Sequence, residues 1–258
     1  MNNSPIGFFD SGLGGTSVLK IAKDVLDKES FIYFGDDKNA PYGEKSREEV
    51  FALAKNCVDF LISKGVKAIV IACNTATGVA VKRLRTMYDL PIISMEPAVK
   101  VGMKNVHGGK VLVMATPTTL KQEKYKNLVS NLHANDEVVE LPCDGLALLV
   151  EEGEWEGEKV ENYLREKLDF IKDMQIDSCV LGCTHYPFVK NSIDKVFKEM
   201  GKDIVIVDGG PGTVNQLKHV LTEKDLLCDE SKEQSIEFYT SSDDENIITM
   251  MKKAVYGK

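Results

Sequence analysis

The sequence predicts an α/β protein of two pseudo-symmetric lobes, each built on a parallel sheet. Three observations support this: strand-like apolar runs alternate with helical patterns, runs of the first half recur in the second, and two matched segments contain a cysteine at the same place. The matched segments are residues 69–77 and 179–187, in which Cys73 and Cys183 each follow a buried apolar run. Open α/β folds present reactive groups where a strand gives way to a loop.

The internal repeat extends beyond the cysteines, because four strand-like runs have partners about 105–112 residues later. The pairs are residues 6–10 with 111–116, 31–36 with 138–142, 68–73 with 178–183, and 91–95 with 203–207. Repeats of about a hundred residues suit small α/β lobes. We therefore expect a first lobe of residues 1–97 and 208–258 and a second lobe of residues 98–207.

Helical patterns fill the gaps between these runs, most clearly over residues 46–64. The apolar positions of residues 46–64 recur with helical spacing. They are Val50, Phe51, Ala54, Cys57, Val58, Leu61 and Ile62. Ser46 and Glu49 form a capping-box pattern, and Gly65 stands where a left-handed residue usually ends a helix.

Short, almost continuously apolar strands between helices predict parallel sheets that are covered on both faces. The last part of the chain falls outside the repeat. It contains a strand-like run at residues 236–239 and a helical pattern at residues 243–255. We expect this tail to pack onto the first lobe.

Composition indicates a soluble globular protein with enough apolar material for two cores: 258 residues, 43% hydrophobic, with a net charge of −8. An acidic chain without a Lys/Arg stripe argues against nucleic acid as a partner. No apolar run is long enough for a membrane helix and no signal-peptide profile is present, so we expect no membrane association and a cytoplasmic location. Six cysteines in such a chain are expected to be free thiols.

Most of the cysteines are expected to be structural, because free cysteine behaves as a small buried hydrophobe. This applies to Cys57, Cys143, Cys179 and Cys228. Cys73 and Cys183 differ, because each lies at a strand end and precedes polar residues.

Zinc is an alternative for Cys179, Cys183 and His185, since both residue types bind it. However, Cys179 is expected to open a strand whose far end carries Cys183, about 13 Å away. No second pair completes a ligand set, so no metal site is expected. His185 is better placed to share a proton with the Cys183 thiol or to orient a substrate; the alternative is an ordinary surface histidine.

The glycine-rich turn at residues 10–16 follows a strand and opens a helix, which permits two interpretations. As a dinucleotide fingerprint it fits at Gly12 and Gly14 but has Ser17 at the third position, with Asp36 at a plausible distance for a ribose contact. Alternatively, its glycines let backbone N–H groups approach a substrate carboxylate. Asp10 and Ser11 would then meet the ammonium group of the substrate or the nearby thiol, which suits an amino acid.

Five motifs together resemble the glutamate racemases, a family of the cofactor-independent aspartate/glutamate racemase superfamily. They are residues 10–15, 41–43, 73–76, 115–119 and 182–187, and the resemblance covers nearly the whole chain. It implies two α/β lobes with the active site in the cleft between them.

The resemblance also implies roles for individual residues. The family's two catalytic cysteines fall on Cys73 and Cys183, and the acid near the first thiol falls on Asp10. His185 and Glu151 fall near the second thiol, with the neighbouring Glu152 as the alternative to Glu151. The implied substrate contacts are Ser11, Tyr42, Gly43, Asn74, Thr75, Thr116, Thr119 and Thr184.

The implied activity is interconversion of L-glutamate and D-glutamate without a cofactor, supplying D-glutamate for peptidoglycan, by a protein that forms a homodimer. Chemically, one thiolate would remove the α-proton while the other thiol returns one to the opposite face. The two sulfurs should then lie roughly 7 Å apart, with substrate between them. Asn74, Thr75 and Thr184 are candidates to hold the carboxylate of the carbanion.

Three other functions stay open at this point. A nicotinamide-dependent dehydrogenase would leave the paired cysteines unexplained. A two-lobed amino-acid binding protein needs no thiols and ordinarily carries a secretion signal. Aspartate racemase differs mainly in its pocket for the distal carboxylate, where residues 41–43 favour glutamate by resemblance.

Overall fold

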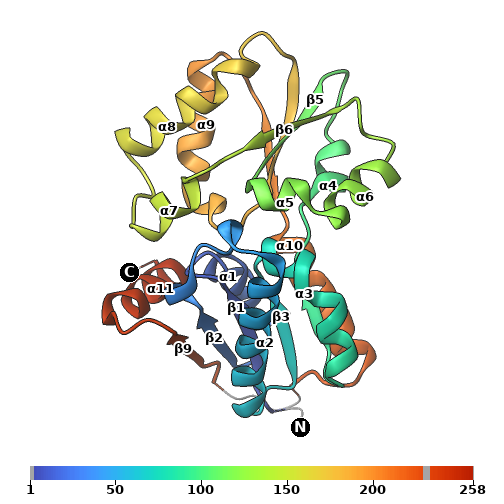
Figure 1. Ribbon diagram of the computed structural model, residues 1–258, viewed down its shortest axis with the longest axis vertical. Coiled ribbons are helices and arrows are strands. Elements are labelled where there is room, and N and C mark those ends of the chain that lie inside the picture. Colours follow the sequence, from blue (N-terminus) through green and yellow to red (C-terminus); the bar gives the residue numbers. More distant parts are fainter. Residues whose placement is uncertain (1–2, 229–232, 258) are drawn as a thin grey trace. The chain divides into compact units, whose positions relative to one another are not determined.

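The computed structural model describes residues 3–228 and 233–257 of the chain. The chain divides into two compact units, residues 1–95 with 210–258 and residues 96–209. Each unit contains one sheet with helices against it (Figure 1).

The first unit alternates strands and helices and ends with the tail. Its strands are β1 (Ile6–Asp10), β2 (Phe31–Gly35), β3 (Ala68–Ile71), β4 (Ile92–Ser94) and β9 (Ile236–Thr240). Its helices are α1 (Thr16–Val25), α2 (Arg47–Ser63), α3 (Asn74–Met87), α10 (Gly210–Glu223) and α11 (Glu245–Tyr256). Two short 3₁₀ turns, η1 (Asp37–Asn39) and η2 (Tyr42–Glu44), lie between β2 and α2.

The second unit repeats this alternation. Its strands are β5 (Lys110–Ala115), β6 (Val138–Pro142), β7 (Ile176–Leu181) and β8 (Val205–Asp208). Its helices are α4 (Val99–Met103), α5 (Pro117–Lys121), α6 (Glu123–Asn131), α7 (Leu146–Glu151), α8 (Glu158–Leu168) and α9 (Lys190–Glu199), with the 3₁₀ turns η3 (Asp169–Ile171) and η4 (Tyr186–Val189).

The two sheets have the same strand order. The first is β4-β3-β1-β2-β9 and the second, taken from its β8 edge, is β8-β7-β5-β6. Every pairing in both sheets is parallel. The four strand pairs expected from the sequence therefore occupy equivalent positions, so β3 corresponds to β7.

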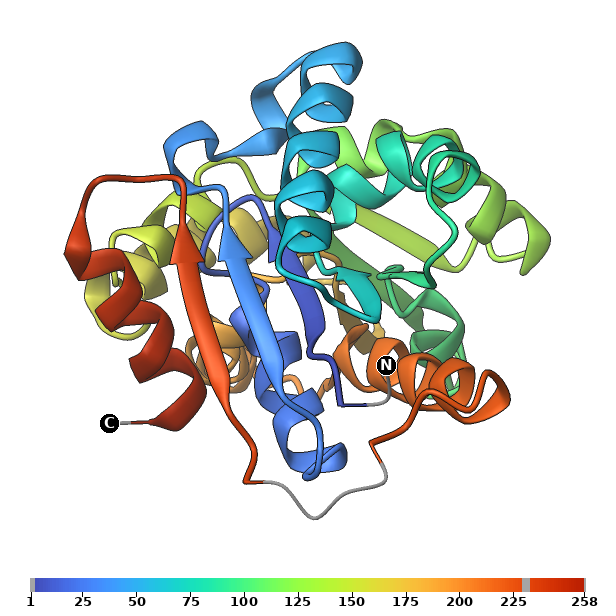
Figure 2. The ribbon, with the colours of Figure 1, turned by 90° about the horizontal axis from the view of Figure 1, so that it is seen from below.

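The tail adds a fifth strand to the first sheet. Strand β9 pairs with β2 in parallel, from Phe31 opposite Ile236 to Gly35 opposite Thr240, and the two lie side by side in Figure 2. Helix α11 follows and packs on α1. The prediction that the tail packs onto the first unit is confirmed.

Both faces of the first sheet are covered, as its sequence predicts. All residues of β1 and β3 are buried. Helices α2 and α3 pack together over one apolar cluster, which includes Phe9, Ile69 and Leu61, while α1 packs on α10 and α11. The near-continuous apolar runs are the ones that a parallel sheet between two helical layers requires.

Helix α2 begins where the sequence predicts, because Ser46 caps it. The Ser46 side chain accepts from the N–H of Glu49, and the Glu49 carboxylate accepts from the N–H of Ser46 at 3.0 Å. Gly65 follows the helix with φ 76°. One expected core position is wrong: Ile62 is 36% exposed, because it lies at the edge of the buried stripe.

The position expected for Cys179 is also wrong. Strand β7 begins at Ile176, so Cys179 lies inside the strand rather than at its start. The strand ends at Leu181, and Cys183 follows in the loop. The error arose because Ile176 and Asp177 alternate in polarity and so do not extend the apolar run that marks the strand in the sequence.

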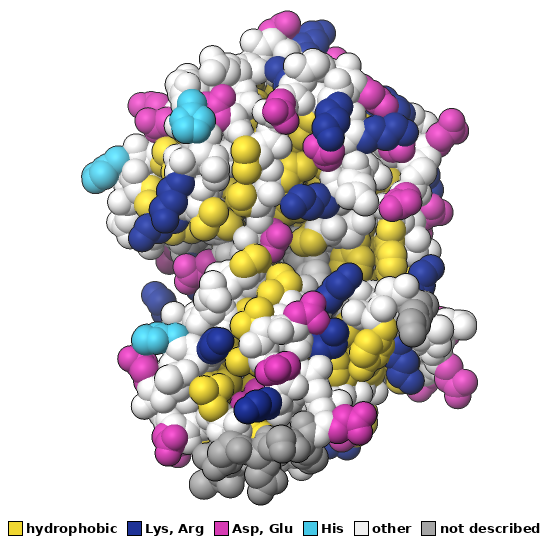
Figure 3. Space-filling view, turned by 180° about the vertical axis from the view of Figure 1, so that it is seen from behind, with side chains coloured by type: hydrophobic (Ala, Val, Ile, Leu, Met, Phe, Trp, Pro, Cys, Tyr) yellow, Lys and Arg dark blue, Asp and Glu magenta, His cyan; other side chains and the backbone are white. Residues whose placement is uncertain are grey.

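The surface mixes charges of both signs. On the face drawn in Figure 3, Lys and Arg side chains are interspersed with Asp and Glu. Among the residues that the structure describes, no helix has both the length and the apolarity to cross a membrane.

The capping box predicts a local contribution to stability. Replacing Ser46 by Ala should lower the free energy of unfolding by about 1 kcal/mol, because an N–H group at the start of α2 loses its acceptor. Urea denaturation measures this change. Ser63→Ala at the other end of α2 is the control and should change stability by less than about 0.5 kcal/mol; equal effects would show that the capping contact adds nothing.

Candidate active site

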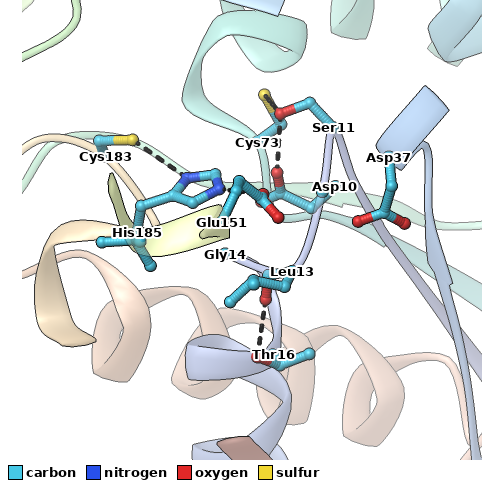
Figure 4. A network of polar contacts seen from close by, with 12 residues as sticks. Asp10, Ser11, Leu13, Gly14, Thr16, Asp37, Cys73, Glu151, Cys183 and His185 are labelled. Atoms are coloured by element: carbon cyan, nitrogen blue, oxygen red, sulfur yellow. Dashed lines mark hydrogen bonds and ion pairs between the residues drawn. The ribbon is translucent and has the colours of Figure 1, made fainter. Parts of the chain in front are cut away.

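The first group of candidate residues lies at the carboxyl ends of β1 and β3. Asp10 ends β1, Ser11 follows it, and Cys73 lies two residues past the end of β3. Cys73 Sγ lies 3.7 Å from Ser11 Oγ, and the Ser11 hydroxyl donates to Asp10 Oδ1 at 3.0 Å (Figure 4). All three side chains are buried, so one hydroxyl links the thiol to a buried carboxyl group.

Cys73 is also the N-cap residue of α3. Its sulfur accepts a hydrogen bond from the N–H of Ala76 at 3.4 Å. The amino end of a helix carries partial positive charge, and this favours the thiolate form over the thiol. The chain fold thus supplies Cys73 with a backbone donor for negative charge.

The glycine-rich turn is held tightly against Asp10. The Tyr33 hydroxyl donates to the carbonyl of Gly12 at 2.6 Å, and the Thr16 hydroxyl donates to that of Leu13 at 2.7 Å. A Cβ atom added at Gly15 would lie 2.7 Å from Asp10 Cβ. Gly15 is therefore needed for α1 to begin directly against the end of β1.

Asn74 and Thr75 form the first turn of α3 beside Cys73, and both are buried. The Asn74 amide nitrogen contacts Met95 Sδ at 3.3 Å. Its Oδ1 atom is buried and has no hydrogen-bond partner among the described residues. Leaving such an atom unpaired costs about 1–3 kcal/mol, so Asn74 is a candidate contact for a polar ligand.

Tyr42 and Gly43 lie in η2, after β2. The Tyr42 side chain is buried: its hydroxyl donates to Asp36 Oδ2 at 2.5 Å and lies 3.7 Å from Cys57 Sγ. Burial raises the pKa of Tyr42 far above its ordinary value, with the charges of Cys57 and Asp36 adding to the effect. The phenol therefore stays protonated and points into the unit.

The second group of candidate residues follows β7. Cys183 lies two residues past the end of the strand, with Thr184 and His185 after it. Cys183 Sγ lies 3.5 Å from His185 Nδ1, and His185 Nε2 lies 2.5 Å from Glu151 Oε1 at the end of α7 (Figure 4). Glu152 instead pairs with Lys159 at 2.8 Å on the surface. Of the two glutamates, Glu151 is the one that contacts His185.

The electrostatic surroundings of His185 favour its protonated form. Burial alone would lower the pKa of His185, but the charge and hydrogen bond of Cys183, together with the contact to Glu151, raise it well above the ordinary value. A protonated imidazole beside Cys183 is both a proton source and a counter-charge for a thiolate.

Thr116 and Thr119 lie at the start of α5, directly after β5. The Thr116 hydroxyl donates to Thr119 Oγ1 at 3.0 Å and accepts from the N–H of Thr119. Strands β5 and β7 are neighbours, and Gly182 packs so closely on β5 that an added Cβ would lie 2.8 Å from Ala115 Cβ. The two threonines and Cys183 consequently share one edge of the sheet.

Three of the other thiols are unsuited to acid/base chemistry. Cys57, Cys143 and Cys179 are buried, and burial raises the pKa of Cys143 to about 12 and those of Cys57 and Cys179 further. Over residues 3–228 and 233–257, no three Cys, His, Asp or Glu side chains are grouped so as to hold a metal ion.

Two side chains that support the candidate residues were not predicted in these roles. Tyr33 holds the glycine-rich turn, and Asp36, considered only as a ribose contact, instead accepts from Tyr42 and from the Asn39 side chain. The signal available in the sequence was weak: both are polar residues within or directly after the apolar strand β2.

Comparison with known proteins identifies the family. The model of the Asp/Glu/Hydantoin racemase family matches residues 16–217. The chain belongs to this family. A curated glutamate racemase from Clostridium perfringens is 49% identical over 99% of this chain and 97% of its own length, and one from Clostridium botulinum is 46% identical over 98% of this chain and 97% of its own.

Solved structures of glutamate racemases have the same fold. A glutamate racemase from Francisella tularensis, solved in complex with D-glutamate, is 32% identical, with a TM-score of 0.85 over 99% of this chain and 95% of its own. A glutamate racemase isoform from Bacillus anthracis is 30% identical, with a TM-score of 0.88 over 100% of this chain and 96% of its own. The prediction of two parallel-sheet lobes flanked by helices is confirmed.

The contact between Glu151 and His185 predicts the charge state of the histidine. Replacing Glu151 by Gln should lower the pKa of His185, because a counter-charge for the imidazolium is removed while the burial stays. Titration of the imidazole by NMR measures this shift.

The surface ion pair of Glu152 with Lys159 supplies the control for this prediction. Glu152→Gln removes a charge one residue away but leaves the His185 contact, so the pKa of His185 should not move; an equal shift in both variants would contradict a specific contact. In the wild type, the raised pKa means that the stabilisation from charged His185 is full below about pH 6.5 and is lost as pH rises through the folded pKa.

Proposed function

We propose that this protein is a glutamate racemase in which Cys73 and Cys183 are the two acid/base groups. One observation carries the proposal: each cysteine lies two residues past the end of a strand, and the two strands, β3 and β7, hold equivalent positions in sheets of the same order. A reaction that exchanges a proton between two faces of one carbon needs two such equivalent groups. The relatives named glutamate racemase support glutamate as the substrate.

The proposed reaction is a transfer of two protons through a carbanion. A thiolate takes the α-proton, so that the C–H bond breaks and an S–H bond forms. The carbanion keeps the electron pair, and the thiol on the opposite face gives its proton to the α-carbon and becomes the thiolate. The roles of Cys73 and Cys183 exchange with the direction of reaction, and the step requires no added cofactor.

The groups beside each sulfur support this chemistry differently. Cys73 has the amino end of α3 and the link through Ser11 to Asp10. Cys183 has His185, which is backed by Glu151. We assign Asp10, His185 and Glu151 to the support of proton transfer, and Ser11, Asn74, Thr75, Thr116, Thr119, Thr184 and the 42–43 segment to substrate contacts.

Two structural relatives bear on the substrate. The Francisella tularensis protein was solved with D-glutamate, and a glutamate racemase from Escherichia coli, 25% identical with a TM-score of 0.84 over 97% of this chain and 95% of its own, was solved with L-glutamate and an activator, UDP-MurNAc-ala. These complexes support binding of both glutamate enantiomers by the present protein.

The direct test is to incubate the purified protein with L-glutamate, after dialysis against chelator and with nothing added, and to follow optical activity. We expect the rotation to fall to zero as D-glutamate forms. Rotation that stays constant, or that changes only when metal or pyridoxal phosphate is supplied, would contradict the proposal.

The two-thiol mechanism predicts that Cys73→Ala and Cys183→Ala each abolish racemisation of both enantiomers, because every turnover needs a base and an acid. Cys→Ser keeps a weak proton donor but loses the thiolate. Each serine variant should therefore exchange the α-proton of one enantiomer faster than that of the other, with opposite preferences in Cys73→Ser and Cys183→Ser. NMR in D2O measures this exchange.

Cys228→Ser is the matched control, since Cys228 is a half-buried cysteine outside both groups and should be replaceable without loss of rate. The wild type in D2O should give an inverted product that carries deuterium at the α-carbon. Inverted product without deuterium, or full activity after loss of Cys73 or Cys183, would refute the paired roles.

Substrate specificity gives a separate prediction. If residues 42–43 contact the distal carboxylate, glutamate should be converted at least about 100-fold faster than aspartate, whose carboxylate is one methylene short of that contact. The kcat/KM values for L-glutamate and L-aspartate measure this. Comparable values would overturn the choice of glutamate but leave the family assignment intact.

Three further parts of the proposal rest on the family resemblance: a role in supplying D-glutamate for peptidoglycan, a homodimeric state and a cytoplasmic location. Light scattering tests the dimer. Depletion of the protein in growing cells, with and without D-glutamate in the medium, tests the biosynthetic role.

A further inference from the structure

A polar cluster packs against the Tyr42 side chain in the first unit. It consists of the buried residues Asp36, Tyr42 and Cys57 and the half-buried Asn39. Asp36 Oδ2 accepts from the Tyr42 hydroxyl at 2.5 Å, and Asp36 Oδ1 accepts from the Asn39 amide at 2.9 Å. Asp36 is 4% exposed and Tyr42 is 1% exposed, so both side chains are buried away from solvent.

The cluster is tied to the first group of candidate residues through the backbone. The N–H of Asp36 donates to the carbonyl of Asp10 at 3.0 Å, directly beyond the last paired residues of β1 and β2. Asp36 thus has its main chain fixed to Asp10 and its side chain fixed to Tyr42. Through these two contacts, Asp36 links the end of the sheet to the segment of residues 42–43.

Packing alone does not explain this arrangement. Burying a carboxyl group and a phenol is costly unless the two are paired, and an apolar pair of similar size would fill the same space at lower cost. Between β2 and α2 the chain forms only two three-residue 3₁₀ turns, η1 and η2. A directional hydrogen bond fixes such a segment more narrowly than apolar contacts do.

We propose that Asp36 is a positioning residue for substrate binding. By accepting the hydrogen bond of the Tyr42 hydroxyl, it fixes the position of the backbone of residues 42–43. This rests on the proposed function, in which that segment contacts the distal carboxylate of glutamate. The phenol of Tyr42 points inward and serves as the anchor, which leaves the backbone of the segment for the substrate.

The test compares Tyr42→Phe, Asp36→Asn and the double variant in racemisation of L- and D-glutamate. Tyr42→Phe removes only the anchoring hydroxyl. Asp36→Asn leaves one acceptor oxygen for two donors. We expect KM for both enantiomers to rise about tenfold in each single variant, equal to about 1.4 kcal/mol. Because a distal contact is made equally in the ground and transition states, kcat should change less than about twofold.

The double variant separates positioning from general damage. Since both substitutions break one contact, its KM should be no higher than that of the worse single variant, whereas independent effects would multiply to about a hundredfold. Tyr125→Phe, which removes the hydroxyl of a buried tyrosine on α6 in the other unit, is the matched control and should leave KM unchanged. Misfolded protein would lower the apparent kcat but not raise KM.

The outcomes are distinct. Unchanged KM in Tyr42→Phe and Asp36→Asn, multiplicative effects in the double variant, or an equal rise in Tyr125→Phe would each overturn the role of Asp36 while wild-type racemisation still supports the proposed function. A wild type that does not racemise glutamate overturns the proposed function, and the positioning role with it.

Discussion

The parallel direction of the strands is the constraint on which the candidate site depends. In a parallel sheet all carboxyl ends meet at one edge, so residues that follow different strands gather there without being near in sequence. In the first unit this brings Asp10 of β1 together with Cys73 beyond β3, and in the second it brings Thr116 beyond β5 to the edge that carries Cys183. The same order in both sheets gives the two thiols equivalent positions.

Close backbone packing then sets the fine geometry at each edge. Gly15 allows α1 to begin against Asp10, and Gly182 allows the chain after β7 to lie on the end of β5. In both cases the nearest obstacle to a side chain includes a Cβ atom, which cannot rotate away. Glycine at these places is required by the approach of two segments, rather than by a left-handed backbone, since neither has a positive φ.

The fold could be predicted closely from the sequence because the strands are short, almost wholly apolar runs repeated at a fixed interval. The capping box placed the start of α2 for a similar local reason.

The start of β7 was missed because Asp177 interrupts the apolar run. The role of Asp36 was missed because it depends on a contact with Tyr42. The Tyr42 side chain points inward because of the path of the chain after β2, and no local sequence pattern indicates this direction. The contact of Glu151 with His185 likewise joins residues 34 apart, and only the structure distinguishes Glu151 from Glu152.

The two units give their thiols unlike neighbours, and thermodynamics limits what this difference can do in the proposed reaction. Cys73 is supported by a helix terminus and by Ser11 with Asp10, whereas Cys183 is supported by a charged His185 with Glu151. Enantiomers have equal free energies in water, so the equilibrium constant is one, and kcat/KM must be the same for L- and D-glutamate whatever groups stand beside each sulfur. Unequal support can therefore make kcat differ between L- and D-glutamate only if KM differs by the same factor. A thiol pair with one protonation state more populated than the other would produce such a matched difference. In the proposed reaction, the unlike neighbours would set which thiol is the resting thiolate, and hence which enantiomer the unliganded protein is ready to bind.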